Sequence, residues 1–305
     1  MFRKLALIAL LAAIAGGLAF FWLTSPKRME AKAMAGMPQG VADRGELVFW
    51  AGGCASCHAA EKAEGDDKLK LGGGVVLKTG FGDFIAPNIS SHAADGIGAW
   101  SLQDFAAAMR LGVSPEGYHY YPSFPYGSYA RISDNDVADL WAFMQTLPAV
   151  DSKAPEHDLA FPFSVRRGIG VWKLLYADPS PVINIDGNDA VLLRGRYLVE
   201  GLGHCGECHT PRDFAGGLIR ERWLAGAPNP EGEGRIPNIT SGEGGIGSWS
   251  VGDIAYYLET GFTPDFDSVG GSMVKVQENM AMLSPEDRAA IAAYLKAVPE
   301  HASEK

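Results

Sequence analysis

The sequence predicts an all-α protein in which two tandem domains of one fold follow an N-terminal membrane helix. Two observations carry this prediction: an apolar run close to the N-terminus, and motifs that return with an offset of 149 to 151 residues. A third is that helix-capping patterns recur in the same order in both halves, whereas strand patterns are weak. The 305 residues are sufficient for two domains of ordinary size.

The N-terminal run is uncharged and apolar over residues 5–23, close to the roughly 20 residues that a membrane-spanning helix needs. A cleaved signal peptide usually has a shorter apolar stretch with a small-residue site directly after it, and residues 24–28 offer no such site. We therefore expect residues 1–24 to be a retained signal anchor, with a cleaved signal as the alternative. Residues 25–40 are expected to form a flexible tether.

The repeat defines the domain organisation. Its paired segments are Cys54-Ala55-Ser56-Cys57-His58 with Cys205-Gly206-Glu207-Cys208-His209, Pro87-Asn88-Ile89-Ser90 with Pro237-Asn238-Ile239-Thr240, and Gly96-Ile97-Gly98 with Gly245-Ile246-Gly247. Segments that keep register in this way predict one fold used twice. We expect domains at 41–150 and 191–300. The linker between them, 151–190, is rich in aromatic residues, which predicts that it packs across both domains.

Each half has the same helix signals. A Ser-x-x-Asp pattern, typical of a helix N-terminus, occurs at Ser101 and Ser133 and again at Ser250 and Ser284. A short helix is also expected before each cysteine motif. The predicted order in each half is helix, cysteine motif, long loop, helix, loop and helix, which suits a small all-α domain.

Charge and cysteine content limit the function. The formal net charge of −10 argues against nucleic acid as a partner. The chain has four cysteines, and all four lie in the two repeated motifs, so none remains for a structural disulfide. An acidic surface is also able to orient a basic partner protein.

Cys-x-x-Cys-His is the attachment motif of c-type haem. Its two thiols bond to the haem vinyl groups, and the adjacent histidine ligates the iron. A zinc site would need four ligands from two distant pairs, and a thioredoxin-like redox pair would be expected once. We therefore predict two covalently bound haem c groups. The attachment and iron-binding residues are Cys54, Cys57, His58, Cys205, Cys208 and His209.

The second iron ligand of the second half is predicted to be Met273, which follows two glycines on the loop before the final helix. A thioether ligand favours Fe(II) and raises the potential, which suits electron transfer. Met280 and Met282 are nearby alternatives, and methionines of this kind also serve as core filler.

The first half departs from this pattern. At the offset of 149, the partner of Met273 is Phe124, and a phenylalanine side chain has no atom that binds iron. His119 lies on the same loop, whereas Met109 and Met144 fall inside predicted helices. The alternatives for the first haem are therefore ligation by His119 or a five-coordinate iron.

Two further residue pairs belong to the repeat. Asn88 and Asn238 stand in Asn-x-Ser/Thr, a glycosylation motif, but their recurrence favours a role in holding loops near the haem edge. Trp100 and Trp249 are expected to pack against the haem or the core.

From about residue 41 to 300 the chain resembles the multihaem cytochrome c subunits of membrane-bound bacterial dehydrogenases, of the gluconate and alcohol dehydrogenase type. The resemblance rests on the paired segments above, on Tyr121-Pro122 with Pro125-Tyr126, and on the run from Gly203 to Arg212. It implies two tandem class I-like cytochrome c domains. It also implies a periplasmic site and electron flow from a dehydrogenase subunit toward quinone or a terminal oxidase. Many such subunits have three haem motifs, and many have methionine where this chain has Phe124.

These inferences predict an electron carrier rather than an enzyme. Covalent haem attachment takes place outside the cytoplasm, so we expect one N-terminal anchor in the bacterial cytoplasmic (inner) membrane and haem domains in the periplasm. The expected partner is a dehydrogenase subunit or another redox protein. The alternatives are a haem enzyme with an open first haem, and a membrane-tethered electron shuttle to an oxidase.

Overall fold

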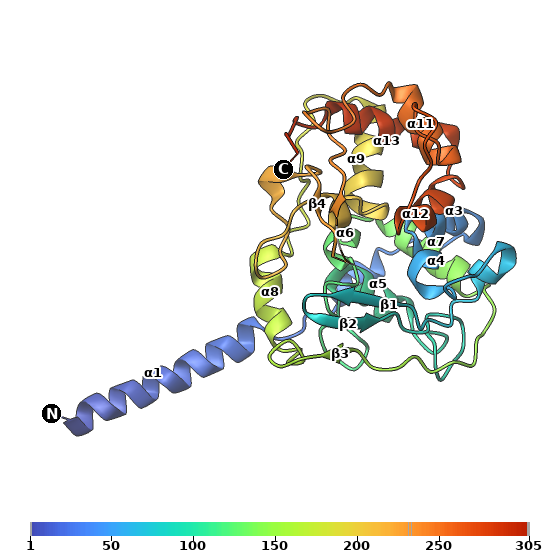
Figure 1. The fold of residues 1–305 in the computed structure, drawn as a ribbon. Helices are drawn as coiled ribbons and strands as arrows, with labels where there is room; N and C mark the ends of the chain where they lie inside the picture. Colours follow the sequence, from blue (N-terminus) through green and yellow to red (C-terminus); the bar gives the residue numbers. More distant parts are fainter. Residues whose placement is uncertain (1, 231, 233, 304–305) are drawn as a thin grey trace.

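The computed structural model describes residues 2–230, 232 and 234–303, and it is mainly helical with few strands, as expected (Figure 1). Met1, the first residue of the expected anchor, lies outside this range. The helices are α1 (Phe2–Leu23), α2 (Ala31–Ala35), α3 (Ala42–Ala51), α4 (Cys54–His58), α5 (Leu102–Leu111), α6 (Tyr126–Tyr129), α7 (Asp134–Met144), α8 (Gly168–Tyr176), α9 (Ala190–Arg196), α10 (Gly206–His209), α11 (Val251–Thr260), α12 (Met273–Met280) and α13 (Pro285–Ala297). Tyr197–Leu202 continues α9 as a π-helical turn, and 3-10 turns occupy Gly65–Leu69 and Arg220–Arg222.

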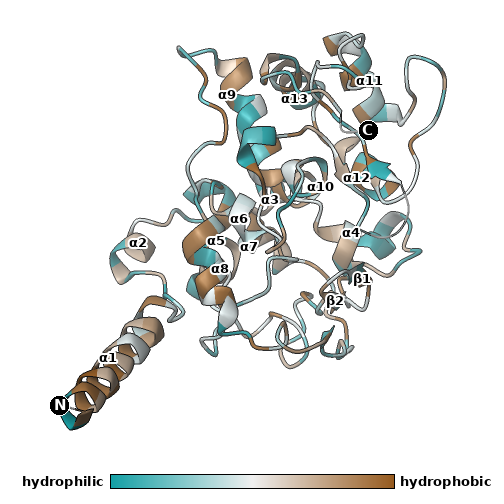
Figure 2. Ribbon diagram, turned by 60° about the vertical axis from the view of Figure 1, so that its left-hand side comes forward, coloured by the Kyte–Doolittle hydropathy of each residue, from teal (hydrophilic) through white to brown (hydrophobic). Residues whose placement is uncertain are grey.

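Helix α1 projects from the body as a separate rod (Figure 1), and none of its described residues is buried. Its surface is apolar along most of its length (Figure 2). Among the described residues it is the one helix long and apolar enough to cross a membrane, a property that a signal sequence shares.

The segment after α1 lies against the body instead of hanging free as a tether. Met29, Met34 and Met37 are half-buried and pack against the core. The Gln103 side chain on α5 donates a hydrogen bond of 3.1 Å to the carbonyl of Met29. The expected flexibility at 25–40 is therefore reduced by packing between residues far apart in the sequence.

The first and last helices of each half cross at a glycine. Helix α3 packs on α7, and α9 packs on α13 in the same way. A Cβ atom on Gly45 would lie 2.0 Å from the carbonyl oxygen of Asp139, and one on Gly195 would lie 2.0 Å from that of Ala290. Only glycine allows the two backbones to approach so closely. The two glycines are 150 residues apart, so the repeat extends to the packing.

The predicted helix starts are confirmed. Ser101 and Ser250 form capping boxes with the aspartates three residues later, at the starts of α5 and α11. The hydroxyls of Ser133 and Ser284 accept hydrogen bonds from backbone amides in the first turns of α7 and α13.

Short strands occur in the long loops. Strands β1 (Val76–Thr79) and β2 (Gly82–Ile85) form an antiparallel hairpin, which β3 (Asp158–Leu159) extends. Strands β4 (Ala227–Pro228) and β5 (Arg235–Ile236) pair at the corresponding place in the second half.

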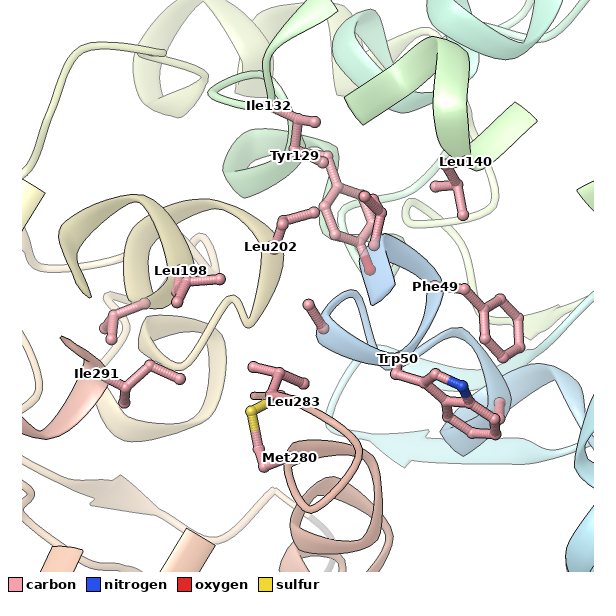
Figure 3. Packing of buried hydrophobic residues seen from close by; sticks show 14 of the residues in the cluster. Phe49, Trp50, Tyr129, Ile132, Leu140, Leu198, Leu202, Met280, Leu283 and Ile291 are labelled. Carbon is pink, nitrogen blue, oxygen red and sulfur yellow. The ribbon is translucent and has the colours of Figure 1, made fainter. Parts of the chain in front are cut away.

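The two halves share one core. Helix α12 of the second half packs on α3 and α4, and α6 of the first half packs on the π-helical turn. Figure 3 shows side chains of both halves in one cluster, with Tyr129 beside Leu202. Polar contacts also join the two halves: the side-chain amide of Asn279 in the second half donates a hydrogen bond of 2.6 Å to the hydroxyl of Ser56 in the first half.

The linker packs across both halves, as its aromatic content predicts. Arg131 of the first half donates to the carbonyl of Asp178, and Arg220 of the second half donates to that of Pro181, both at 2.9 Å. Glu200 on the π-helical turn is buried and accepts from the amides of Val182 and Ile183 at 2.7 and 2.9 Å. Because both carboxylate oxygens are used, Glu200 fixes the end of the linker on the second half.

Candidate haem sites

Each motif histidine is oriented by a proline carbonyl. Nδ1 of His58 lies 2.8 Å from the oxygen of Pro87, and Nδ1 of His209 lies 2.8 Å from that of Pro237. A carbonyl oxygen only accepts, so Nδ1 carries the proton and Nε2 keeps its lone pair for a metal. Burial lowers the pKa of both imidazoles, which the hydrogen bond to the proline partly opposes. The rings are therefore neutral, as iron ligation requires.

The motif cysteines lie on one short helical turn with their histidine. Cys54 and Cys57 are three positions apart on α4, so both thiols face the same side. Burial is the main cause that raises the pKa of the Cys54 and Cys205 thiols to about 12. No disulfide joins any of the four cysteines in the part of the chain that the structure describes.

The residue before each motif has a left-handed backbone, with φ of 63° at Gly53 and 38° at His204. This conformation ends the preceding helix and lets the cysteine turn begin in a new direction. Glycine adopts it without strain, whereas histidine does so at a cost. The two turns lie close together, because a Cβ atom on Gly53 would be 3.7 Å from Nε2 of His204.

The repeated asparagines hold the loops that orient the histidines. Asn88 is 4% exposed and donates to the carbonyls of Val150 and Ser152 at 2.7 and 2.8 Å, while its Oδ1 accepts from the amide of Ser90 at 2.8 Å. Asn238 follows Pro237 and is equally buried. It donates to the carbonyl of His301 at 2.6 Å and accepts from the amide of Thr240 at 2.8 Å.

The structural role expected for these asparagines is confirmed, and the glycosylation alternative is wrong because both side-chain amides are buried and bonded. Trp100 and Trp249 are half-buried and pack against the core, also as expected. The role of the proline carbonyls was missed by sequence reasoning. The recurrence of Pro-Asn at nearly the same distance from each motif histidine, 29 and 28 residues, was the available signal.

The structure supports the register that pairs Phe124 with Met273. Isolated bridges join Val113 to His119 and Phe262 to Ser268, with the same offset of 149. Tyr120 donates to the carbonyl of Gly112 at 2.8 Å, and Val269 donates to that of Gly261 at 2.7 Å.

Met273 is half-buried at the start of α12. Of the nearby alternatives, Met280 is buried in the core and Met282 is half exposed. Met109 and Met144 are buried on α5 and α7 and belong to the core, as their helical positions predict.

His119 is not available as an iron ligand. Its Nε2 lies 2.9 Å from the carbonyl oxygen of Thr24, and its Nδ1 lies 3.2 Å from Nζ of Lys173. One ring nitrogen is therefore engaged at the end of α1 and the other by Lys173 on α8. Sequence proximity to Phe124 suggested ligation, but the loop turns the His119 side chain toward the N-terminal helix instead.

The donor sets fit covalently bound haem. Each half offers two thiols and one neutral imidazole within a single turn, with the unprotonated ring nitrogen free. A protein built from two small helical halves, each with a Cys-x-x-Cys-His turn, belongs to the class of c-type cytochromes.

Comparison with known proteins supports the assignment to the c-type cytochromes. The family model for cytochrome c matches residues 42–148. A dihaem cytochrome c-type protein of Cereibacter sphaeroides is 56% identical over 93% of this chain and 94% of its own length. This chain belongs to the cytochrome c family, within a group of relatives that includes cytochrome subunits of dehydrogenases.

Two of these relatives are longer. The cytochrome subunit of fructose dehydrogenase from Gluconobacter japonicus is 37% identical over 85% of this chain and 53% of its own length. The cytochrome c subunit of gluconate 2-dehydrogenase from Pantoea cypripedii is 33% identical over 95% of this chain and 65% of its own length. This chain thus spans less than two thirds of either subunit.

Proposed function

We propose that this chain is a dihaem c-type cytochrome that transfers electrons in the periplasm, from a partner dehydrogenase subunit to quinone or a terminal oxidase. The observation that carries the proposal is the duplicated set of Cys-x-x-Cys-His turn, proline carbonyl and buried asparagine. A zinc site or a thioredoxin-like redox pair would not require this set of residues twice. The names of the dehydrogenase relatives support the choice of partner.

Haem iron, when bound, supplies one-electron redox chemistry. The chain's own residues hold it: Cys54 and Cys57 in one half, and Cys205 and Cys208 in the other, supply thiols for the covalent bonds. Hydrogen bonds from His58 and His209 to the proline carbonyls fix the ring orientation and keep Nε2 unprotonated. Of these groups only His209 is buried, whereas the Cys208 side chain is exposed.

Met273 is proposed as the residue that would supply the second protein ligand to the iron in the second half. Its thioether would favour the reduced iron and raise the potential of that haem. The contact between Gly53 and His204 places the two attachment turns side by side, which supports electron exchange between the two haems.

The test is a haem count by mass spectrometry of the denatured protein, which retains only covalently bound haem. We expect two haems in the wild type. One is expected after Cys54→Ala with Cys57→Ala, and one after Cys205→Ala with Cys208→Ala. A wild-type chain with a single haem, or with none, contradicts the proposal.

We also propose that α1 anchors the protein in the bacterial inner membrane, with the haem-binding body on the periplasmic side. The length and apolar surface of α1 support this. Arg167 contributes by holding the helix end: its Nε donates to the hydroxyl of Thr24 at 3.0 Å. Full-length protein should stay with membranes after alkaline carbonate washing and be digested by protease in spheroplasts. Release by carbonate would indicate a cleaved signal instead.

Purification from mild detergent separates the partner hypotheses. A dehydrogenase subunit that copurifies at a fixed ratio supports a complex. A cytochrome that elutes alone and still reduces an oxidase supports the alternative of a membrane-tethered shuttle.

A further inference from the structure

We propose that the first haem site is open on the side of Phe124 and binds small uncharged diatomic ligands, whereas Met273 closes the second site. This inference rests on the proposed function, because it requires haem in both halves. It concerns the chain's own residues at the position of the second axial ligand, where the two halves differ.

The first step is the equivalence of the two positions. The loops before Phe124 and Met273 carry the same isolated bridge and matching backbone hydrogen bonds at an offset of 149, up to Tyr120 and Val269. The same register, carried four residues further, pairs Phe124, just before α6, with Met273, the first residue of α12. One side chain carries a thioether, and the other has no donor atom.

The second step is the position of Phe124 in the first half. Its ring centroid lies 5.8 Å from that of Tyr129, and the Tyr129 hydroxyl donates to the carbonyl of Gly52 at 2.7 Å. Gly52 stands two residues before Cys54, so Phe124 is one side chain away from the attachment turn. A loop aimed at this turn is expected to present Phe124 to the haem, as the second half presents Met273.

The third step is that the histidine, methionine and lysine side chains considered as donors to the first iron are engaged elsewhere. His119 uses both ring nitrogens on Thr24 and Lys173. Met109 and Met144 are buried in the core from within their helices. The Nζ atom of Lys173 is held by the carbonyls of Leu111 and Gly112 at 2.5 and 2.7 Å.

The chemistry of the side chains around Phe124 sets the class of ligand. Around Phe124 stand the rings of Tyr120, Tyr126 and Tyr129, with centroids 5.9, 6.3 and 5.8 Å from its own. Aromatic rings of this kind favour small uncharged molecules, because moving a charged ligand out of water into an apolar environment is costly. Carbon monoxide is the probe for this class.

The experiment uses the purified full-length holoprotein in detergent, with EPR of the oxidised form and carbon monoxide titration of the reduced form. We expect one high-spin haem per chain, and one carbon monoxide bound per chain. Phe124→Met should convert that haem to low spin and weaken carbon monoxide binding at least tenfold. Met273→Ala should raise the stoichiometry to two.

Controls separate the possible failures. Phe214→Met, at a side chain that is 96% exposed, should behave as the wild type. Phe124→Leu, which has no donor atom, should keep the high-spin signal even if Phe124→Met fails to fold. A wild type with two covalent haems, both low-spin and unreactive toward carbon monoxide, overturns the open site and leaves the electron-carrier function intact. A haem count below two overturns the proposed function itself.

Discussion

His204 and Tyr129 meet edge to face across the boundary between the two halves, with ring centroids 5.6 Å apart and planes at 80°. His204 begins the second attachment turn, and the Tyr129 hydroxyl donates to the carbonyl of Gly52, just before the first. One pair of rings thus connects both Cys-x-x-Cys-His turns, in addition to the helix contacts between the two halves.

Removal of the Tyr129 hydroxyl tests this connection. Tyr129→Phe keeps the ring contact with His204 but removes a buried hydrogen bond, so the free energy of unfolding should fall by about 1 kcal/mol. Urea denaturation of the holoprotein measures the change. Tyr118→Phe is the matched control, because Tyr118 is 40% exposed. Equal effects of the two variants would refute a structural role for the Tyr129 hydroxyl.

The helix crossings predict a second effect. Gly45→Ala and Gly195→Ala would each place a methyl group against a backbone carbonyl of the facing helix, and overpacking of this kind costs about 1–3 kcal/mol. Thermal unfolding should show a lower Tm for both variants. Gly168→Ala is the control, since nothing lies within 4 Å of its added Cβ. If all three variants melt like the wild type, the close approach of the helices is wrong.

The buried asparagines predict a third effect, on the free energy of unfolding. Asn88→Ala leaves two carbonyls and one amide without their partner, so we expect a loss of about 3 kcal/mol in the free energy of unfolding. Asn135→Ala, at an exposed position on α7, should change stability by less than about 0.5 kcal/mol. Denaturant titration distinguishes the two, and similar midpoints would contradict the loop-holding role of Asn88.

The position of His119 predicts that the stability of the folded protein depends on pH. Burial lowers its pKa, and the charges of Lys173 and Arg167 lower it further, against the opposing hydrogen bond to Thr24. The unfolded chain therefore binds more protons than the folded one below about pH 6.5, so the stability that neutral His119 contributes is lost as the pH falls through its lowered pKa.

His119→Gln tests this dependence, because glutamine offers a donor and an acceptor but does not titrate. The variant should lose less Tm than the wild type between about pH 7.5 and about pH 5. Parallel pH profiles of the two proteins would show that His119 does not contribute. His157, whose pKa burial also lowers, remains in both proteins and cancels in the comparison.

Arg167 predicts how firmly the N-terminal helix is docked. Besides Thr24, its guanidinium donates to the hydroxyl of Ser25 at 3.1 Å and to the carbonyl of Phe21. Arg167→Ala should let the segment at 25–40 open more often, and a loss of about 1.5 kcal/mol corresponds to roughly tenfold faster cleavage by thermolysin. Arg28→Ala, at an exposed position, should cleave at the wild-type rate. Unchanged cleavage of Arg167→Ala would mean that other contacts hold the helix.

The sequence by itself determined the features that depend on neighbours along the chain. The haem motifs, the serine helix caps and the length of the apolar N-terminal run are local patterns, and each has one dominant physical interpretation. The repeat added the equivalence of Phe124 and Met273, because an offset survives any arrangement of the halves.

Only the tertiary structure decided which distant groups meet. It paired His58 with the carbonyl of Pro87, turned His119 toward Thr24, and set His204 against Tyr129. It also packed the methionines of the expected tether against the core. The physical reason is that each of these contacts joins backbone or side-chain atoms from separate elements. Their partners follow from how the helices pack, which no local pattern encodes.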